Sequence, residues 1–331
     1  MVRNIGVIGA GRMGRIHCRV LSRLGHLTAV CDVASLQNLQ LDPKVALYSS
    51  LDKMLTEHPE INGIVIATPT SSHAPIAETI IKQYGQVKSI LIEKPLADTI
   101  EAAERLRKLV NANKIRVTVG HIEVYNPVVQ RMLQMIKDDL IGTVRSIIFQ
   151  RRGAVSDGRL ESIGDVFQDI GIHDFDIATR FFPPGKYSFF VGGVVAHHEI
   201  VNSATALLSG KGLTCTFLLS REYAGKMRRI ELEGEKATMI VDLLDQFIEV
   251  RQLGIMSGDL KSITVPYGSG ERIKVYGEPL LEECWNFLDT LDGRPPLVTV
   301  DDGIRAMVLV EAARRSYSTR NIVEVEIPKH S

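Results

Sequence analysis

Residues 5–14 read Ile-Gly-Val-Ile-Gly-Ala-Gly-Arg-Met-Gly. A short apolar run, Ile5–Ile8, leads into a glycine-rich turn that opens a helical pattern. In such a turn Gly9 permits the tight bend, Gly11 lets a pyrophosphate approach the backbone, and Gly14 lets helix and strand pack closely. The unpaired N–H groups at the start of the helix favour a bound phosphate. The stretch therefore predicts a dinucleotide-binding βαβ unit.

An acidic residue follows the next apolar run, Leu27–Cys31. Asp32 lies about 20 positions beyond the glycine turn, where a carboxylate accepts hydrogen bonds from the adenosine ribose and repels a 2′-phosphate. We therefore expect NAD as the cofactor, with NADP bound less well. Arg12 works in the opposite direction, because its cation can hold a phosphate. The cofactor residues predicted in this part of the chain are Gly9, Gly11, Arg12, Met13, Gly14 and Asp32.

The first 120 residues alternate between short apolar runs and amphipathic stretches. The runs are Asn4–Gly9, Leu27–Cys31, Gly63–Ala67, Ser89–Glu93 and Arg116–Gly120. The helical patterns between them are Arg12–Leu24, His73–Tyr84 and Thr99–Asn113. Nearly continuous apolar runs suit strands that are covered on both faces. We predict an α/β fold with a doubly wound parallel sheet, a Rossmann domain, over residues 1–122.

The sequence pattern changes after Gly120. Strand-like segments joined by short glycine-containing turns follow, and they predict a mainly antiparallel sheet. These segments are Val144–Arg152, Tyr187–Ala196, Val201–Ser209, Thr214–Arg221, Arg229–Glu233 and Thr238–Asp242. Helices are expected near Asn126–Asp138, Asp165–Phe182, Glu278–Leu291 and Asp302–Ser316. We therefore predict a second, α+β domain over residues 123–331, which carries the substrate site and the contacts between subunits.

Composition limits the classes of partner. Lys plus Arg is 39 and Asp plus Glu is 39, so the net charge is zero and gives no general attraction for nucleic acid or membrane. No apolar run approaches the roughly 18 residues that span a bilayer, and the first residues lack a signal-peptide pattern. The four cysteines form no CxxC pair, which disfavours a zinc ribbon, a redox motif or a disulfide framework. We expect a cytoplasmic protein with reduced thiols.

Two further segments lie at the ends of predicted parallel strands, where doubly wound sheets bind ligands. Ala67–His73 follows one strand, and Glu93-Lys94-Pro95 ends another. Pro95 favours an extended Lys94, which can then project from a fixed backbone. A lysine taken alone is more often a solvated surface residue. The cofactor residues predicted here are Thr68, Pro69, His73, Glu93 and Lys94.

These segments together resemble one family, the glucose–fructose oxidoreductase / inositol dehydrogenase / rhizopine-catabolism (Gfo/Idh/MocA) oxidoreductases. The resemblance rests on Gly9–Gly14, Ala67–His73, Glu93–Leu96, Gly120-His121 and Asp169–Asp174, which occur in the family's order. It implies an N-terminal nicotinamide-binding domain and a C-terminal domain with a large open-faced sheet. It also implies oxidation or reduction of a hydroxyl group on a sugar or polyol.

Asp169 and His173 are four positions apart, so a helix places them on one face. That spacing alone more often marks a surface interaction than a catalytic pair. The resemblance implies the catalytic reading, with Lys94 as the third member from the other domain. Removing hydride from a carbinol carbon requires a base for the hydroxyl proton, and a histidine suits that role without large tuning. The sequence leaves open whether Lys94 or His173 takes the proton.

The segment Gly120–Val128 resembles family members that oxidise the 3-hydroxyl of UDP-N-acetylglucosamine, although those read Arg-Phe where this chain has Val124-Tyr125. An unphosphorylated sugar or inositol is the alternative substrate. The substrate residues predicted are Lys94, His121, Asn126, Arg152, Asp169 and His173. Arg152 suits a phosphate or carboxylate, and a solvated strand end explains it equally well.

No catalytic metal is expected, because His121 and Glu123 make only two ligands and adjacent His197 and His198 point to opposite faces of a strand. The strand Tyr187–Ala196 carries apolar residues on both sides, and this predicts a homodimer or a homotetramer. A non-catalytic NAD-binding sensor is the alternative class of function. The joint presence of a lysine, an aspartate and a histidine of the catalytic pattern favours an enzyme.

Overall fold

The chain forms two compact units in the computed structural model, which describes residues 3–34, 36, 39–154, 164–197, 200–252 and 271–329. The first unit contains the chain up to Tyr125, the segment Glu278–Met307 and the end from Pro328. The second unit contains Asn126–Gly277 and Val308–Ile327. Residues 278–307, which the sequence had assigned to the second domain, thus pack with the first unit. The boundary of independent domains at residue 122 stays a prediction.

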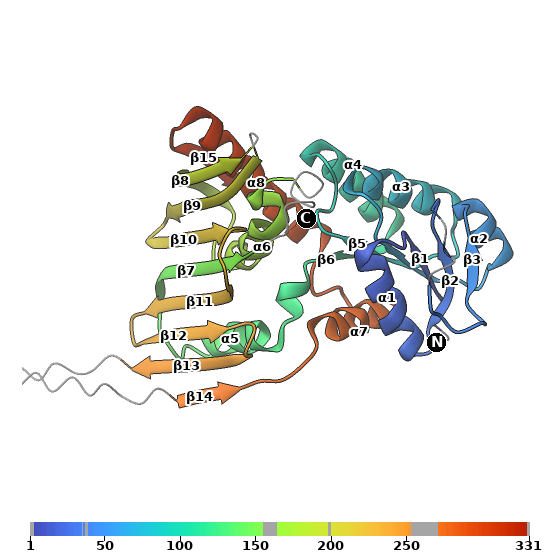
Figure 1. The fold of residues 1–331 in the computed structure, drawn as a ribbon, viewed down its shortest axis with the longest axis horizontal. Helices are drawn as coiled ribbons and strands as arrows, with labels where there is room; N and C mark the ends of the chain where they lie inside the picture. Colours follow the sequence, from blue (N-terminus) through green and yellow to red (C-terminus); the bar gives the residue numbers. More distant parts are fainter. Residues whose placement is uncertain are drawn as a thin grey trace, which may run out of the picture. The chain divides into compact units, whose positions relative to one another are not determined.

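A six-stranded parallel sheet forms the centre of the first unit, in the order β3-β2-β1-β4-β5-β6 (Figure 1). The strands are β1 (Ile5–Ile8), β2 (Leu27–Cys31), β3 (Ala46–Tyr48), β4 (Gly63–Ile66), β5 (Ser89–Glu93) and β6 (Arg116–Gly120). Every residue of β1, β4 and β5 is buried, which explains their continuous apolar sequences. The predicted doubly wound sheet is confirmed. Its strand order reverses between β1 and β4, where such folds bind ligands.

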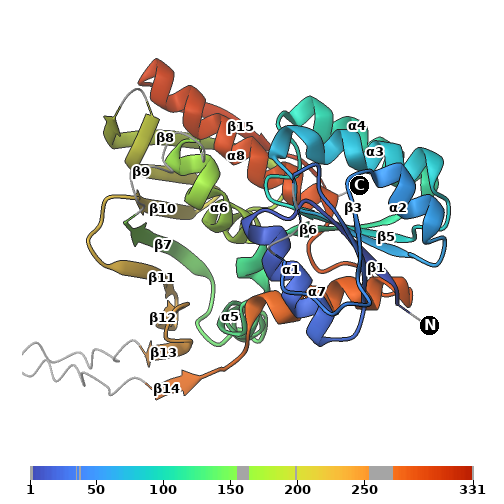
Figure 2. The ribbon, with the colours of Figure 1, turned by 45° about the vertical axis from the view of Figure 1, so that its right-hand side comes forward.

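Helices cover this sheet on both faces. They are α1 (Arg12–Arg23), α2 (Leu51–Glu57), α3 (His73–Gln83), α4 (Ile100–Asn113) and α7 (Pro279–Leu291), with short helices η1 (Thr70–Ser72) and η2 (Ile122–Tyr125). Although α7 comes late in the chain, it lies beside α1, as both ribbon views show (Figures 1 and 2). Its apolar side, including Leu280, Phe287 and Leu288, packs into the core around β1. This burial is why the segment belongs to the first unit.

The second unit is built on a nine-stranded sheet in the order β14-β13-β12-β11-β7-β10-β9-β8-β15. The strands are β7 (Val144–Gly153), β8 (Gly185–His197), β9 (Ile200–Gly210), β10 (Leu213–Ser220), β11 (Lys226–Gly234), β12 (Ala237–Asp242), β13 (Phe247–Gln252), β14 (Glu271–Lys274) and β15 (Val323–Ile327). Among the pairings of these strands, β10 with β7 is parallel and the others are antiparallel. The predicted mainly antiparallel sheet is confirmed.

One face of this sheet carries helices and the other is open. The helices are α5 (Pro127–Lys137), the π-helix η4 (Phe167–Gly171), α6 (Ile172–Thr179) and the later part of α8 (Val300–Thr319). Phe175 of α6 packs edge-to-face against Phe217 of β10, at 4.9 Å between ring centroids. On the opposite face Phe190 is 38% exposed and Leu207 is 37% exposed. The large open-faced sheet is therefore present.

No helix within the described residues is both long enough and apolar enough to span a membrane.

Candidate functional site

The glycine turn after β1 has the geometry that a dinucleotide requires. Gly9 has φ +91°, and a Cβ there would lie 2.7 Å from the backbone carbon of Ala67. A Cβ on Gly14 would lie 1.8 Å from the carbonyl oxygen of Gly9, so both positions exclude a side chain. Gly11 differs, because its Cβ would meet no atom within 4 Å. Two glycines therefore serve packing, while the third leaves open space that fits a pyrophosphate.

The start of α1 offers donors for that pyrophosphate. Gly11 is the N-cap and has no side chain to bond the first N–H groups, and the first turn contains no acidic residue. Arg12 is exposed and Met13 is half-buried at this end of the helix. The free donors and the helix dipole favour an anion here.

Asp32, at the end of β2, is held beside the same turn. Its Oδ2 accepts a hydrogen bond from the backbone N–H of Ala10 at 2.5 Å, and its Oδ1 accepts from that of Ala34 at 2.8 Å. Burial and the nearby Asp32 charge raise the pKa of the Cys31 thiol to about 11. The carboxylate is thus fixed at the position where NAD-binding folds bind the adenosine ribose.

His73 ties together the two loops that follow β4 and β5. Its buried ring lies with Nε2 at 2.8 Å from the carbonyl oxygen of Thr68 and Nδ1 at 2.8 Å from that of Pro95. Both partners are backbone carbonyl oxygens, one from each loop, so the ring is held from two sides. Ser72 adds a hydrogen bond from its hydroxyl to the carbonyl oxygen of Pro69 at 2.7 Å. These bonds fix the turn from which half-buried Lys94 projects.

Glu93 was predicted as a cofactor residue, and its carboxylate lies in the interior of the first unit. Its Oε1 is 2.7 Å from Nε2 of His17, a residue of α1 that the sequence analysis did not single out. Its Oε2 accepts a hydrogen bond from the backbone N–H of Lys94 at 3.3 Å. Gly120 permits this placement, because a Cβ there would lie 3.2 Å from the same oxygen. Glu93 therefore supports the turn of Lys94 from within.

His121 and Asn126 are both buried near the end of β6 and the start of α5. Asn126 is the N-cap of α5: its Oδ1 accepts from the backbone N–H of Val128 at 3.3 Å. Its amide nitrogen donates to the carbonyl oxygen of Leu243 at 3.2 Å. These bonds give Asn126 a structural role in the second unit. A role of His121 or Asn126 in substrate binding stays a prediction.

Asp169 and His173 lie at the junction of a π-helix with an α-helix. Asp169 is in η4, and His173 is the second residue of α6. The sequence predicted one continuous α-helix here, and the structure inserts a wider turn. Such π turns occur frequently at functional sites. Gly171 allows α6 to approach the sheet, since a Cβ there would lie 2.8 Å from Leu219.

Arg221 is a candidate site residue that the sequence analysis missed. It follows β10, its side chain is 0% exposed, and its Nη1 lies 3.5 Å from Oδ2 of Asp169, which is 20% exposed. Arg221 is held by the carbonyl oxygen of Gly164 at 2.7 Å and by Oδ1 of Asn202 at 2.6 Å. The signal in the sequence was the alternation of the strand, which places Arg221 on the same face as buried Phe217. A fixed guanidinium therefore holds the carboxylate of Asp169.

The neighbouring arginines of β7 point in opposite directions. Arg151 faces α6, where its Nε and Nη2 donate to Oδ1 of Asp174 at 2.9 and 2.8 Å. Arg152 lies on the open face with Gln150, to which it donates at 2.8 Å, and its guanidinium lies 4.9 Å from the ring centroid of Tyr223. The second unit thus does not bring Arg152 together with Asp169 and His173.

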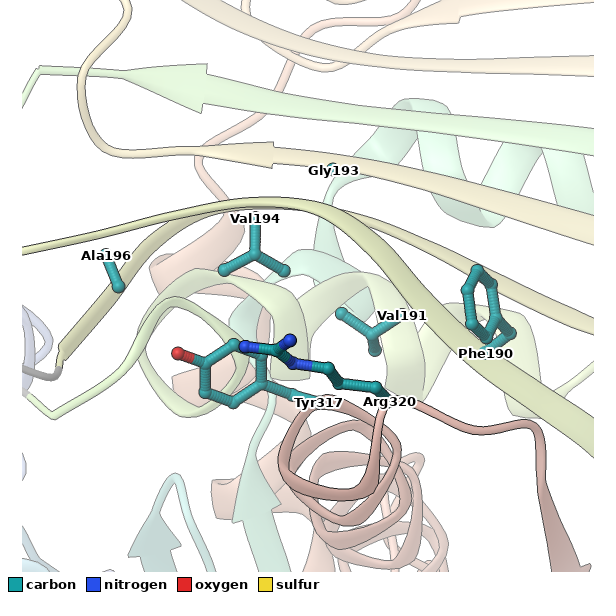
Figure 3. A pocket seen from close by; sticks show the side chains of 7 residues that line it. All are labelled: Phe190, Val191, Gly193, Val194, Ala196, Tyr317 and Arg320. Atoms are coloured by element: carbon teal, nitrogen blue, oxygen red, sulfur yellow. The ribbon is translucent and has the colours of Figure 1, made fainter.

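A separate pocket of about 340 Å³ lies in the second unit between β8 and the end of α8 (Figure 3). It is lined by Phe190, Val191, Gly193, Val194, Ala196, Tyr317 and Arg320. None of these is a predicted site residue, so this pocket is distinct from the candidate active site.

The four cysteines are buried free thiols. Burial raises the pKa of Cys18 to about 12 and also raises the pKa values of Cys215 and Cys284. These thiols stay protonated near neutral pH, which disfavours a cysteine nucleophile. His198, which was weighed above together with His197 as a possible metal ligand, lies outside the described residues.

Comparison with known proteins places the chain in a family. Residues 3–121 match the family described as "Oxidoreductase family, NAD-binding Rossmann fold", and residues 129–240 match "GFO/IDH/MocA C-terminal domain". Inositol 2-dehydrogenase of Rhizobium meliloti is 24% identical over 98% of this chain and 100% of that protein. UDP-N-acetylglucosamine 3-dehydrogenase of Acidithiobacillus ferrooxidans is 26% identical over 93% of this chain and 94% of that protein.

A crystal structure of that Acidithiobacillus enzyme has a TM-score of 0.81 at 25% identity, covering 96% of this chain and 98% of its own. Another similar fold, an Agrobacterium radiobacter oxidoreductase in complex with NAD+, L-tartaric acid and magnesium, has a TM-score of 0.82 at 17% identity. It covers 99% of both chains. The glycine turn, Asp32 and both family matches agree, and the chain belongs to the Gfo/Idh/MocA family of NAD-binding oxidoreductases.

Proposed function

We propose that the protein oxidises a secondary hydroxyl group of a sugar or polyol, with Lys94, Asp169 and His173 acting at the reacting carbon. One observation carries this proposal: η4 and α6 present an aspartate and a histidine together, and a buried arginine holds the aspartate. An aspartate that serves only as a polar surface group on a helix does not require a contact with a buried arginine. The family relationship supplies the reaction class.

Each of the three residues has a task that its chemistry suits. NAD, when bound, supplies the acceptor for the hydride of the carbinol carbon. His173 and Lys94 are the groups able to accept the hydroxyl proton, since both exchange a proton in catalytic sites. A Lys94 ammonium also stabilises a developing alkoxide. Asp169, fixed by Arg221, accepts a hydrogen bond from a neighbouring hydroxyl and so orients the substrate.

The 3-hydroxyl of a nucleotide sugar such as UDP-N-acetylglucosamine is the substrate we propose first. Support comes from the similarity to the Acidithiobacillus enzyme over nearly the whole chain and from the segment Gly120–Val128. Inositol is the second candidate, because inositol dehydrogenases match with similar identity and coverage.

The substrate test compares kcat/KM for UDP-N-acetylglucosamine, free N-acetylglucosamine and myo-inositol by NADH absorbance, with NMR of the product to locate the oxidised carbon. The first proposal expects turnover of the nucleotide sugar and a ketone at carbon 3. Faster oxidation of myo-inositol would replace it by the second candidate. Tight NAD binding without turnover of any of the three would favour a sensor.

We also propose that two copies pair through the open face of the nine-stranded sheet, alone or as half of a tetramer. Phe190 and Leu207 are exposed on that face, and identical faces commonly pair about a two-fold axis. Light scattering at micromolar concentration tests this, and a monomeric mass would exclude it.

A further inference from the structure

Three side chains from distant parts of the sequence meet inside the first unit: His17 of α1, Glu93 at the end of β5 and Glu283 of α7. Their exposures are 0%, 6% and 0%, and their nitrogen and carboxylate oxygen atoms lie within 4.8 Å of one another. His17 links the group through Nε2, which lies 2.7 Å from Oε1 of Glu93. Its Nδ1 lies 3.8 Å from Sγ of Cys284. We call His17, Glu93 and Glu283 the interior triad.

Glu283 is the unusual member. Both of its carboxyl oxygens are buried without a hydrogen-bond partner among the described residues. The adjacent turns of α7 place Leu280 and Phe287 in the apolar core. A carboxylate in this position loses its hydration and faces a second carboxylate, and both effects favour the neutral form. Burial, and then the charge of Glu93, raise the pKa of Glu283 well above its usual value.

We propose that Glu283 remains a neutral carboxylic acid beside Glu93, and that Glu283 and His17 are positioning residues for Lys94. This inference rests on the role proposed above for Lys94. The connection is short, because Oε2 of Glu93 accepts the backbone N–H of Lys94 at 3.3 Å while Oε1 is held by His17. An ionised Glu283 would repel Glu93 and disturb the turn that presents Lys94.

Two further neighbours of the triad bring no charge of their own. From α7 the additional titratable group in contact is the thiol of Cys284, whose pKa is raised chiefly by burial, so it stays neutral. From β6 the neighbour of Glu93 is Gly120, which has no charge. A neutral carboxylic acid keeps one O–H donor, whereas a carboxylate has none.

A bound divalent cation is the alternative explanation, since a histidine and two carboxylates are zinc ligands. The geometry of the triad favours a proton. Two ligand atoms about 2.0–2.2 Å from a tetrahedral metal lie roughly 3.3–3.6 Å apart. Nε2 of His17 and Oε1 of Glu93 are 2.7 Å apart, the distance of a hydrogen bond that involves a charged group.

The experiment compares Glu283→Gln, Glu283→Met and Glu283→Ala with a control, Glu282→Gln, which changes the exposed neighbour on α7. Gln keeps the shape and the donor of a neutral acid, whereas Met keeps only the volume. We expect Met and Ala to lower kcat about 10- to 100-fold, the scale of a misplaced catalytic group. We expect Gln to restore most of kcat, with NAD affinity unchanged in every variant.

Infrared spectroscopy of the whole protein provides a readout that needs no substrate. At pH 8 the unmutated protein should show the C=O band of a buried protonated carboxyl group, and Glu283→Gln should lose it. If Glu283→Gln lost no such band, the proposal would be wrong. One equivalent of metal in the purified protein that Glu283→Gln removes would also overturn it, as would equal turnover of the Met and Gln variants.

Failure of this inference and failure of the proposed function are distinguishable. If no sugar or inositol is oxidised by the unmutated protein, the proposed reaction fails, while the infrared and metal measurements still decide the state of Glu283. If the unmutated protein is active and Glu283→Met matches it, the reaction stands and the triad has no positioning role.

Discussion

Two carboxyl groups support the candidate site in opposite ways. In the second unit Asp169 lies beside Arg221, a guanidinium that is charged at every working pH and is itself held by Gly164 and Asn202. In the first unit Glu283 lies beside another carboxylate, that of Glu93, in an apolar core. The two acids therefore differ in their surroundings: a held guanidinium lies beside Asp169, whereas burial, and then a second carboxylate, favour the neutral form of Glu283.

The largest effects should come from the two residues proposed to exchange the hydroxyl proton, Lys94 and His173. Lys94→Ala and His173→Ala should each lower turnover by roughly 10²–10⁴-fold, the range for losing a positioned acid or base. NAD affinity should stay nearly unchanged, because the glycine turn and Asp32 are intact. Steady-state kinetics and NAD titration measure the two quantities separately. Full turnover in either variant would make that residue part of the scaffold.

Replacing Arg221 tests whether its guanidinium positions Asp169 in the second unit. Arg221→Met leaves Asp169 without its guanidinium, and we expect kcat to fall about 10- to 100-fold through misplacement of the carboxylate. Arg221→Lys should recover part of the loss because it restores the charge. The matched control is Arg229→Met, which removes a half-exposed arginine paired with Glu231 on the open face of the same sheet. Equal kinetics in Arg221→Met and this control would exclude a positioning role for Arg221.

In the first unit, the pH dependence of the unfolding free energy tests the protonation state of Glu283. The pKa of Glu283 is raised in the folded protein, so above about pH 4.3 the unfolded chain ionises this group while the folded protein keeps its proton. Stability then falls with rising pH by about 1.4 kcal/mol per pH unit until the folded pKa is reached. Glu283→Gln lacks this loss, so its advantage in unfolding free energy should grow from pH 5 to pH 7. Urea unfolding at both values checks this, and a constant difference would contradict it.

The smallest effect concerns a third carboxylate, Asp32, which accepts hydrogen bonds from the backbone N–H groups of Ala10 and Ala34 beside the glycine turn. It should give NAD a preference over NADP of about tenfold or more, since like charges in contact cost more than one 1.4 kcal/mol step. Asp32→Ala should weaken NAD and tolerate NADP. Titration of both cofactors measures the ratio. Equal affinities in the unmutated protein would contradict the assignment.

Local patterns made much of the fold predictable. The strands β1, β2, β4, β5 and β6 appear where apolar runs predicted them, because strands covered on both faces need continuous apolar sequence. Short or half-exposed elements were missed. β3 has three residues, and α2 and the strand pair β13 and β14 fell outside every predicted segment. β15 pairs with β8 from the far end of the chain, a pairing that no local pattern contains.

The residues of the candidate site also fall into those that local sequence patterns reveal and those that they do not. The glycine turn, Asp32 and the Glu93-Lys94-Pro95 turn were visible because their spacing along the chain carries the signal. The interior triad was not, because His17 and Glu283 are each far in sequence from Glu93 and meet it only through packing of α1 and α7. Arg221 was also hidden, since it meets Asp169 across 52 positions.

The proposed reaction is measured as formation of NADH when the protein is mixed with NAD and either UDP-N-acetylglucosamine or myo-inositol. We expect a rise in NADH absorbance with at least one of them, and its near loss in Lys94→Ala and His173→Ala while both variants still bind NAD. Tight NAD binding with no NADH from either substrate, or equal rates in the variants, would contradict a dehydrogenase that works through Lys94, Asp169 and His173.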